Sequence, residues 1–202
     1  MARIRLTKNA LRAEELKLRQ FERYLPTLQL KKSMLQAEVI AACVEIGQME
    51  MQKDKAIKQV DSFAELLAKE TDMGLLAFLR VECVAKRYEN IAGVEIPIFE
   101  QVVFAKADYS LFDTPVWFDS ALKKLRHMVV IREKIHVAEE KKHALEKDLR
   151  DVSIRVNLFE KVLIPSSEQN IKKIKVFLGD QALAAVAQAK VAKQKILAKR
   201  VR

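Results

Sequence analysis

Apolar residues recur every seven positions, in alternating steps of three and four, along the first third of the chain. Fourteen of the sixteen positions in this repeat are apolar, which is improbable for an unpatterned chain of this composition. Such spacing keeps one stripe of a helix facing a partner helix, as in a coiled coil. The stripe comprises Leu11, Leu18, Phe21, Leu25, Leu28, Leu35, Val39, Ala42, Ile46, Met49, Ala56, Val60, Phe63 and Leu67, with Lys32 and Lys53 as its interruptions.

A second stripe with the same spacing follows in the C-terminal part of the chain. It comprises Met128, Ile131, Ile135, Ala138, Leu145, Leu149, Val152, Val156, Phe159 and Leu163, with Lys142 as the interruption. Beyond Pro165 the register shifts, and residues 181–200 form an alanine-rich run. The two stripes predict two long helices, the second of which ends in a thin segment with small side chains.

The segment between these helices has a different period. Alternating residues over 79–85 and 94–98 flank a turn signal at 89–93, which predicts a short β-hairpin. Pro97 suggests that the second strand lies at a sheet edge. Thr114 can cap the following helix, and Pro115 suits its first position.

Together these elements predict a mainly α fold, a long antiparallel two-helix coiled coil with a small middle segment that contains the hairpin. We expect an N-terminal coiled-coil helix over 1–68, a middle segment with hairpin and loop over 69–115, and a C-terminal coiled-coil helix with a basic, alanine-rich tip over 116–202. The predicted seam residues are Leu18, Phe21, Leu25, Leu28, Leu35, Val39, Ile46, Leu145, Leu149, Val152, Val156, Phe159 and Leu163.

Two prolines lie within the predicted helices and should bend them, because each removes an internal hydrogen bond. If Leu67 faces Leu125, the antiparallel register places Pro26 almost opposite Pro165. Both helices would then bend at one level. The same register leaves the alanine-rich tail as a single helix beyond its partner.

The formal net charge of +10 is concentrated near the two ends of the chain. Residues 1–32 carry a net +6 and residues 161–202 a net +8, so the middle is mildly acidic. No charge-free run approaches the roughly 20 residues of a membrane span, and the N-terminus lacks the apolar core of a secretion signal. These features favour a soluble, cytoplasmic protein.

The sequence offers little for catalysis or for binding a cofactor. Its four glycines form no phosphate-binding loop, and no grouping of a nucleophile, a base and an orienting residue is evident. Cys43 and Cys83 are expected to be small buried apolar residues. His136, Glu140 and His143 share one helix face and could hold a metal, but the adjacent lysines make a solvated face the preferred interpretation. We therefore predict no catalytic residue, metal or cofactor.

Several segments resemble, in this order, the D subunit of V-type and A-type rotary ATPases (ATP synthases). They are RLTKNALRAEELKLRQF near the start, LQLKKSML at 28–35, NIAGVEIPIFE at 90–100, YSLFDTP at 109–115 and RVNLFEKVLIP at 155–165. The positions that match the two most specific motifs include Asn90, Gly93, Pro97, Arg155, Asn157, Glu160 and Pro165. The chain departs from the family pattern at Ser33, Ile154, Ser167 and Asn170.

The resemblance implies a non-catalytic central-stalk rotor subunit that couples ATP hydrolysis or synthesis to rotation and ion transport. Its implied partners are a ring of catalytic A and B subunits, the F subunit and an adaptor of C/d type on the membrane rotor. It also implies a location peripheral to the membrane. The ring-contacting tip would include Lys190, Lys193, Lys195, Lys199 and Arg200.

Two other functions remain open from the residues themselves. The basic tail could contact phosphates in nucleic acid, although it has no aromatic residues for base stacking. A generic coiled-coil scaffold, such as a secretion stalk, would have the same composition and heptads. Only the motif segments separate these alternatives from a rotor.

Overall fold

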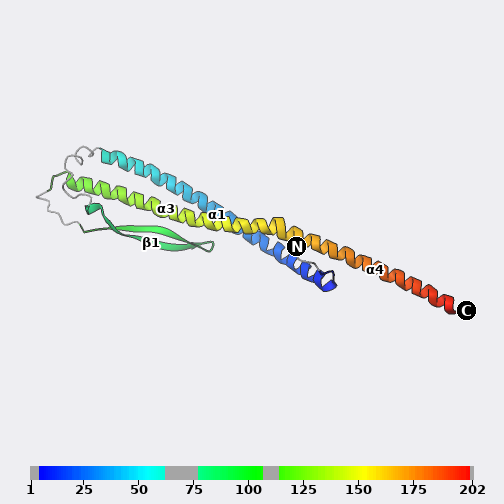
Figure 1. The fold of residues 1–202 in the computed structure, drawn as a ribbon. Coiled ribbons are helices and arrows are strands. Elements are labelled where there is room, and N and C mark those ends of the chain that lie inside the picture. Colours follow the sequence, from blue (N-terminus) through cyan, green and yellow to red (C-terminus); the bar gives the residue numbers. More distant parts are fainter. Residues whose placement is uncertain (1–4, 62–76, 107–113, 201–202) are drawn as a thin grey trace. The chain divides into compact units, whose positions relative to one another are not determined.

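The computed structural model describes residues 5–61, 77–106 and 114–200. Helix α1 (Lys8–Asp61) is followed by a short 3₁₀ turn, η2 (Ala77–Leu79), and by strands β1 (Val81–Ile91) and β2 (Val94–Phe104). The C-terminal part consists of helix α3 (Phe118–Leu158), a five-residue π-helical turn, η3 (Phe159–Leu163), and helix α4 (Ile164–Arg200) (Figure 1). The predicted mainly α fold with a central hairpin is confirmed.

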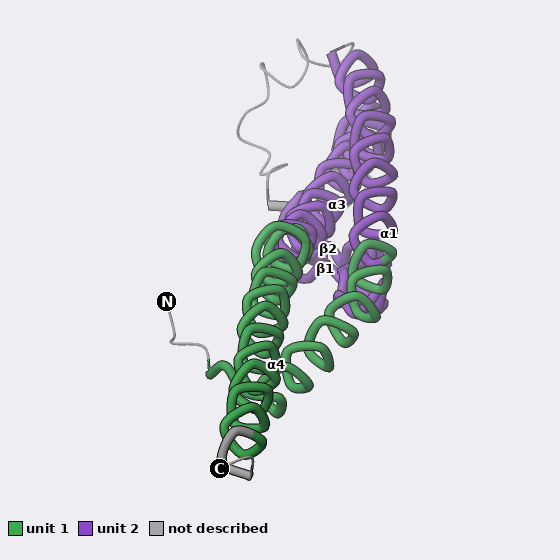
Figure 2. Tube along the Cα trace, turned by 90° about the vertical axis from the view of Figure 1, so that its right-hand side faces the viewer, with its two compact units in different colours: residues 1–30, 152–202 green, residues 31–151 purple. Residues whose placement is uncertain are grey.

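The chain divides into two compact units (Figure 2). Unit 1 contains residues 1–30 and 152–202, and unit 2 contains residues 31–151. The domains predicted from the sequence are consecutive segments with limits at 68/69 and 115/116, whereas unit 1 combines segments from both ends of the chain. The limit at 68/69 lies outside the described residues. Leu67, which was expected to face Leu125, lies outside them as well.

In unit 1 the two helical segments run antiparallel. Glu15 of α1 pairs with Lys175 of α4 at 3.1 Å, and Gln29 contacts Glu160 at 2.5 Å, so rising numbers in one segment meet falling numbers in the other. Helix α1 starts after Thr7, whose Oγ1 accepts a hydrogen bond from the Ala10 N–H at 3.2 Å, as expected of an N-cap.

Unit 2 contains the corresponding antiparallel pair of α1 and α3 together with the hairpin. Lys141 of α3 pairs with Glu45 of α1 at 3.0 Å. Further along, Ala56 packs in one buried cluster with Ile131 and Ile135. Buried apolar side chains thus lie between the helices, as the heptads predicted.

The hairpin in unit 2 is longer than the alternating pattern indicated. Its strands pair from Val81↔Phe104 to Ile91↔Val94, and the chain reverses through Ala92 and Gly93 alone. Both turn residues have positive φ, 52° and 81°, as a type I′ turn requires. A glycine at 93 meets this requirement without the steric cost that a side chain brings. Asn90 Oδ1 accepts the Gly93 N–H at 2.9 Å and so stabilises the turn.

Two sequence-based expectations about side chains are wrong. Cys43 and Cys83 are both exposed and free. Cys43 follows Ala42 of the seam, and one residue rotates a helix by about 100°, which turns the thiol away from the partner. Cys83 lies next to an irregularity in the strand register, and a bulge shifts the alternation of inward and outward residues.

The start of the second long helix is also later than predicted. Pro115 precedes the helix, and its carbonyl accepts a hydrogen bond from the Phe118 N–H at 2.9 Å. Helix α3 begins only at Phe118, whose side chain is 1% exposed. A turn therefore separates the proline from the helix that it was expected to open.

Candidate functional site

The seam in unit 2 is closed by apolar packing. Leu35 and Ala42 of α1 and Leu145 of α3 are fully buried. Val39, Ile46 and Leu149, which were predicted for the same seam, are half-buried. In this part of the helix pair, apolar side chains are removed from water. Their burial contributes most of the stabilisation of such an interface.

The seam in unit 1 is buried more unevenly. Val152 and Val156 are buried, at 4% and 2% exposure. Phe21 and Phe159 meet edge to face with ring centroids 5.3 Å apart, yet both remain half-buried. The other predicted seam residues of this unit are also half-buried, namely Leu18, Leu25, Leu28 and Leu163.

The helix changes form just before Pro165. The Ile164 N–H donates to the Phe159 carbonyl, five residues back, and residues 159–163 form the π turn. A proline cannot donate a hydrogen bond, and its ring would crowd the carbonyl four residues earlier, so a wider turn at this point accommodates it. Pro26 lies inside the unbroken helix α1.

The residues that match the family motifs differ in their surroundings. Pro97 is buried within the hairpin, whereas Asn90, near the end of β1, and Gly93, in the turn, are exposed. Pro165 is half-buried, and three polar motif residues are exposed: Arg155, Asn157 and Glu160. Among these three, Glu160 has a described partner in Gln29, whose Nε2 donates to its carboxylate.

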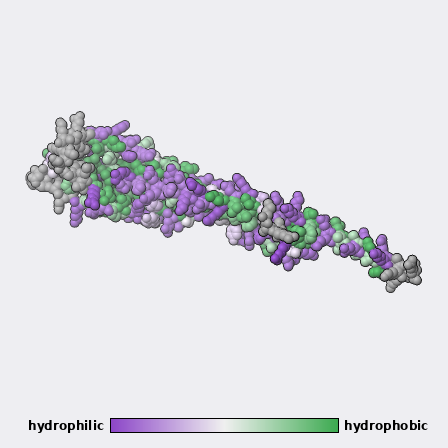
Figure 3. Space-filling view, viewed as in Figure 1, coloured by the Kyte–Doolittle hydropathy of each residue, from purple (hydrophilic) through white to green (hydrophobic). Residues whose placement is uncertain are grey.

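The end of α4 has no packing partner among the described residues. Every described side chain from Gln181 to Leu197 is exposed, including Lys190, Lys193 and Lys195. The side chains of Lys199 and Arg200 lie outside the described residues. Apolar and polar residues are intermixed along this end (Figure 3), and the segment contains no Asp or Glu. It is therefore an exposed basic helix, as the register predicted.

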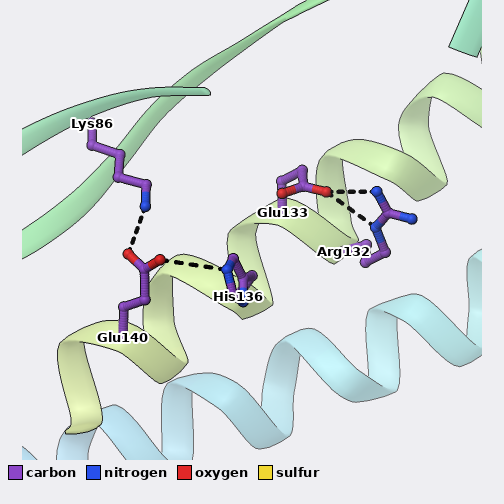
Figure 4. Close-up of polar contacts among 5 residues, drawn as sticks. All are labelled: Lys86, Arg132, Glu133, His136 and Glu140. Carbon is purple, nitrogen blue, oxygen red and sulfur yellow. Dashed lines mark hydrogen bonds and ion pairs between the residues drawn. The ribbon is translucent and has the colours of Figure 1, made fainter. Parts of the chain in front are cut away.

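Local patterns in the sequence did not indicate how the hairpin attaches to α3 in unit 2. Lys86 Nζ of β1 donates to Glu140 Oε2 at 2.6 Å, and the other oxygen of Glu140 lies 3.4 Å from His136 Nε2 (Figure 4). The Lys134 ammonium lies 5.4 Å from the ring centre of Phe99. Glu140, one of the three residues considered for a metal site, is thus paired with Lys86 and His136.

A second attachment lies nearer the start of α3. The Arg126 guanidinium lies 5.1 Å from the ring centre of Phe104 and donates to the Phe78 carbonyl at 3.1 and 3.3 Å. Cation–aromatic contacts of this kind hold the hairpin beside the helix. The hairpin also has two buried apolar side chains, Val94 and Ile96.

The hollows found among the described residues are surface features. Hollows on α1 and α4 are open and lined by one helix each, for example by Arg12, Glu15, Leu16 and Arg19. No group of three His, Cys, Asp or Glu side chains among the described residues could hold a metal ion. None of the described helices has an apolar stretch long enough for a membrane span.

Paired antiparallel helices, an exposed basic helical end and a side hairpin are features of a coiled-coil stalk protein. The family model for the ATP synthase D subunit matches residues 10–194. This chain belongs to that family, and it is accordingly a non-catalytic component of the central stalk of a V-type ATP synthase. The resemblance seen in the motif segments is confirmed.

Curated relatives are similar along nearly their whole length. The chain is 44% identical over 196 residues to the V-type ATP synthase D subunit of Chlamydia caviae, which covers 96% of this chain and 94% of that protein. It is 45% identical over 197 residues to the protein of the same name from Chlamydia trachomatis serovar L2, and the match covers 96% of this chain and 97% of that protein. For that of Chlamydia pneumoniae the identity is 42% over 201 residues, with 98% and 96% covered.

Proposed function

We propose that this chain is the rotating shaft that connects a ring of catalytic A and B subunits to the membrane rotor. Its helix pair transmits torque, and its orientation decides which catalytic interface is open. The F subunit and an adaptor of C/d type are the further partners of this proposal. The chain would act on the cytoplasmic side, peripheral to the membrane, and the chemistry would take place in the ring.

The observation that carries this proposal is the exposed basic end of α4. A helix of about 17 consecutive exposed residues is costly to keep ordered unless its own composition favours helix or a partner surrounds it. Its described lysines, Lys190, Lys193 and Lys195, fall at different angles around the helix axis. Charges on several sides suit a segment that turns inside a collar with many weak contacts, whereas a fixed docking helix would concentrate them on one face.

Deletion of residues 183–202 tests the role of this end. Because the described side chains removed are exposed, we expect the melting temperature of the isolated chain to change little. Association with the ring should weaken, or ATP hydrolysis should proceed without ion movement. Co-purification with A and B subunits and coupled ion transport are the measurements.

A matched variant separates charge from length. Replacing Lys190, Lys193 and Lys195 with Gln keeps the helix but removes three charges, so its defect should be smaller than that of the deletion and should increase with salt concentration. Full coupling after the deletion would contradict insertion of this end into the ring. Steep, salt-dependent binding of the chain to duplex DNA would instead support the nucleic-acid alternative.

A further inference from the structure

Three departures from regular helical bonding occur close together in unit 1. Pro26 has no N–H, so the Glu22 carbonyl lacks its usual donor. Pro165 withholds the corresponding hydrogen bond from Lys161. Immediately before Pro165, the bond from Ile164 to Phe159 converts residues 159–163 into a π turn. Each departure lowers the local resistance of a helix to bending.

Contacts across the pair place these departures at one level. The aromatic pair Phe21–Phe159 and the hydrogen bond between Gln29 and Glu160 lie on either side of Pro26 along α1. Pro165 follows Glu160 by less than two helical turns. The sequence-based expectation that the two prolines face each other therefore agrees with the contacts within unit 1.

The alignment matters because an intact partner helix normally stiffens a helix at a position where a backbone hydrogen bond is missing. Here each helix lacks a backbone hydrogen bond at the same level, although α1 continues unbroken through Pro26, so neither helix stiffens the other there. The lateral contacts at this level include a half-buried ring pair and an exposed amide–carboxylate bond, and the predicted seam residues Leu25, Leu28 and Leu163 are only half-buried. Buried side chains lie on either side of this level, Val152 and Val156 before it and Ser167, Ile171 and Ile174 after it.

We infer that residues 21–29 and 158–165 form a flexible joint, at which the helix pair of unit 1 bends reversibly during turnover. The bending itself follows from the bonding pattern. Its use during turnover rests on the proposed rotor function, since a shaft that turns an asymmetric load benefits from a segment that bends and recovers.

Amide hydrogen exchange on the full-length chain tests the bending. In the wild type, residues 158–165 should exchange faster than residues 140–150 of α3. The double variant Pro26→Ala/Pro165→Ala restores two N–H donors and should slow exchange over 158–165 by about tenfold or more. Ser166→Ala, which adds an alanine beside the joint without restoring a donor, is the control and should leave the rate nearly unchanged.

The single variants test the argument from alignment. If restoring the hydrogen bond in one helix also stiffens the other, Pro26→Ala alone slows amide exchange in residues 158–165, and Pro165→Ala alone slows it in residues 21–29. Slower exchange confined to the substituted helix would overturn the paired joint. Equal exchange in wild type and double variant would overturn the joint altogether.

Turnover in the assembled complex tests the use of the joint. The double variant should enter the ring but hydrolyse ATP several-fold more slowly than the wild type, whereas Ser166→Ala should match the wild type. Unchanged hydrolysis despite slowed exchange would overturn the role in turnover. Failure of the wild-type chain to enter the ring would contradict the proposed rotor function instead, while the exchange result on the isolated chain would stand.

Discussion

The helix pair of unit 2 and the exposed end of α4 show two different ways to maintain a helix. In unit 2, Leu35 and Leu145 are fully buried and the helices depend on each other. At the end of α4, all described side chains from Gln181 to Leu197 are exposed. Burial of a stripe therefore stabilises the first region, whereas the second depends on the helix-forming tendency of its own residues.

The amino-acid compositions of the two regions differ in the same sense. The segment from 181 to 200 consists mainly of Ala, Lys, Gln and Leu, which are strong helix formers. The part of α1 in unit 2 contains Gly47 and several β-branched residues, which are weaker ones. A helix whose side chains are free of any partner within the described residues can offer all its faces to another protein. This is consistent with the role proposed for the tip.

The largest expected effect is that of a charge placed in the seam. Leu35→Asp in unit 2, or Val156→Asp in unit 1, should lower the free energy of unfolding by about 3 kcal/mol or more, because the carboxylate is buried without a partner. Leu183→Asp places the same charge at a site that is 71% exposed and should change it by less than about 0.5 kcal/mol. Denaturant unfolding measures all three, and equal effects in seam and tail would mean that the stripe has been misassigned.

A smaller effect is expected from glycine in each region. Ala189→Gly should cost about 1 kcal/mol of local helix stability, visible as reduced helical circular dichroism and faster amide exchange near residue 189, with the main unfolding transition unchanged. Ala42→Gly removes a fully buried methyl group as well and should lower global stability by about 1.5–2 kcal/mol. A shift of the main transition by Ala189→Gly would show that the tail packs on the rest of the chain.

The smallest effect concerns the attachment of the hairpin in unit 2. Glu140→Gln weakens the ion pair with Lys86, whose side chain is 25% exposed, and should cost less than about 1 kcal/mol, with most of that loss disappearing at high salt. Glu139→Gln, at an exposed neighbouring position, is the control. Release of the hairpin by Glu140→Gln, seen as loss of amide protection in β1, would mean that the burial of Val94 and Ile96 is not sufficient to hold the hairpin in place.

The sequence predicted those features that depend on local periodicity. Heptad spacing identified Leu35, Leu145 and Val152 as inward-facing, and the Asn-Ile-Ala-Gly segment located the hairpin turn. The π turn that precedes Pro165 could not be predicted from local periodicity. A proline removes a donor, but whether the helix kinks, ends or widens into a π turn depends on the packing of the neighbouring helix.

Contacts between distant segments were likewise missed. The pairing of Arg126 with Phe104 and of Lys134 with Phe99 joins residues of different elements, and no repeat in the sequence links them. The exposure of Cys83 has a similar cause, since a strand irregularity reverses the alternation that the residues suggest. Seam positions thus follow from spacing, whereas the position of the hairpin on α3 follows from three-dimensional packing.

Native mass spectrometry of this chain, co-expressed with candidate A, B and F subunits, tests the central claim most directly. The account predicts a complex that contains one copy of this chain for each ring of A and B subunits. Absence of the chain from the ring complex, or several copies in each ring, would contradict its role as a single central shaft.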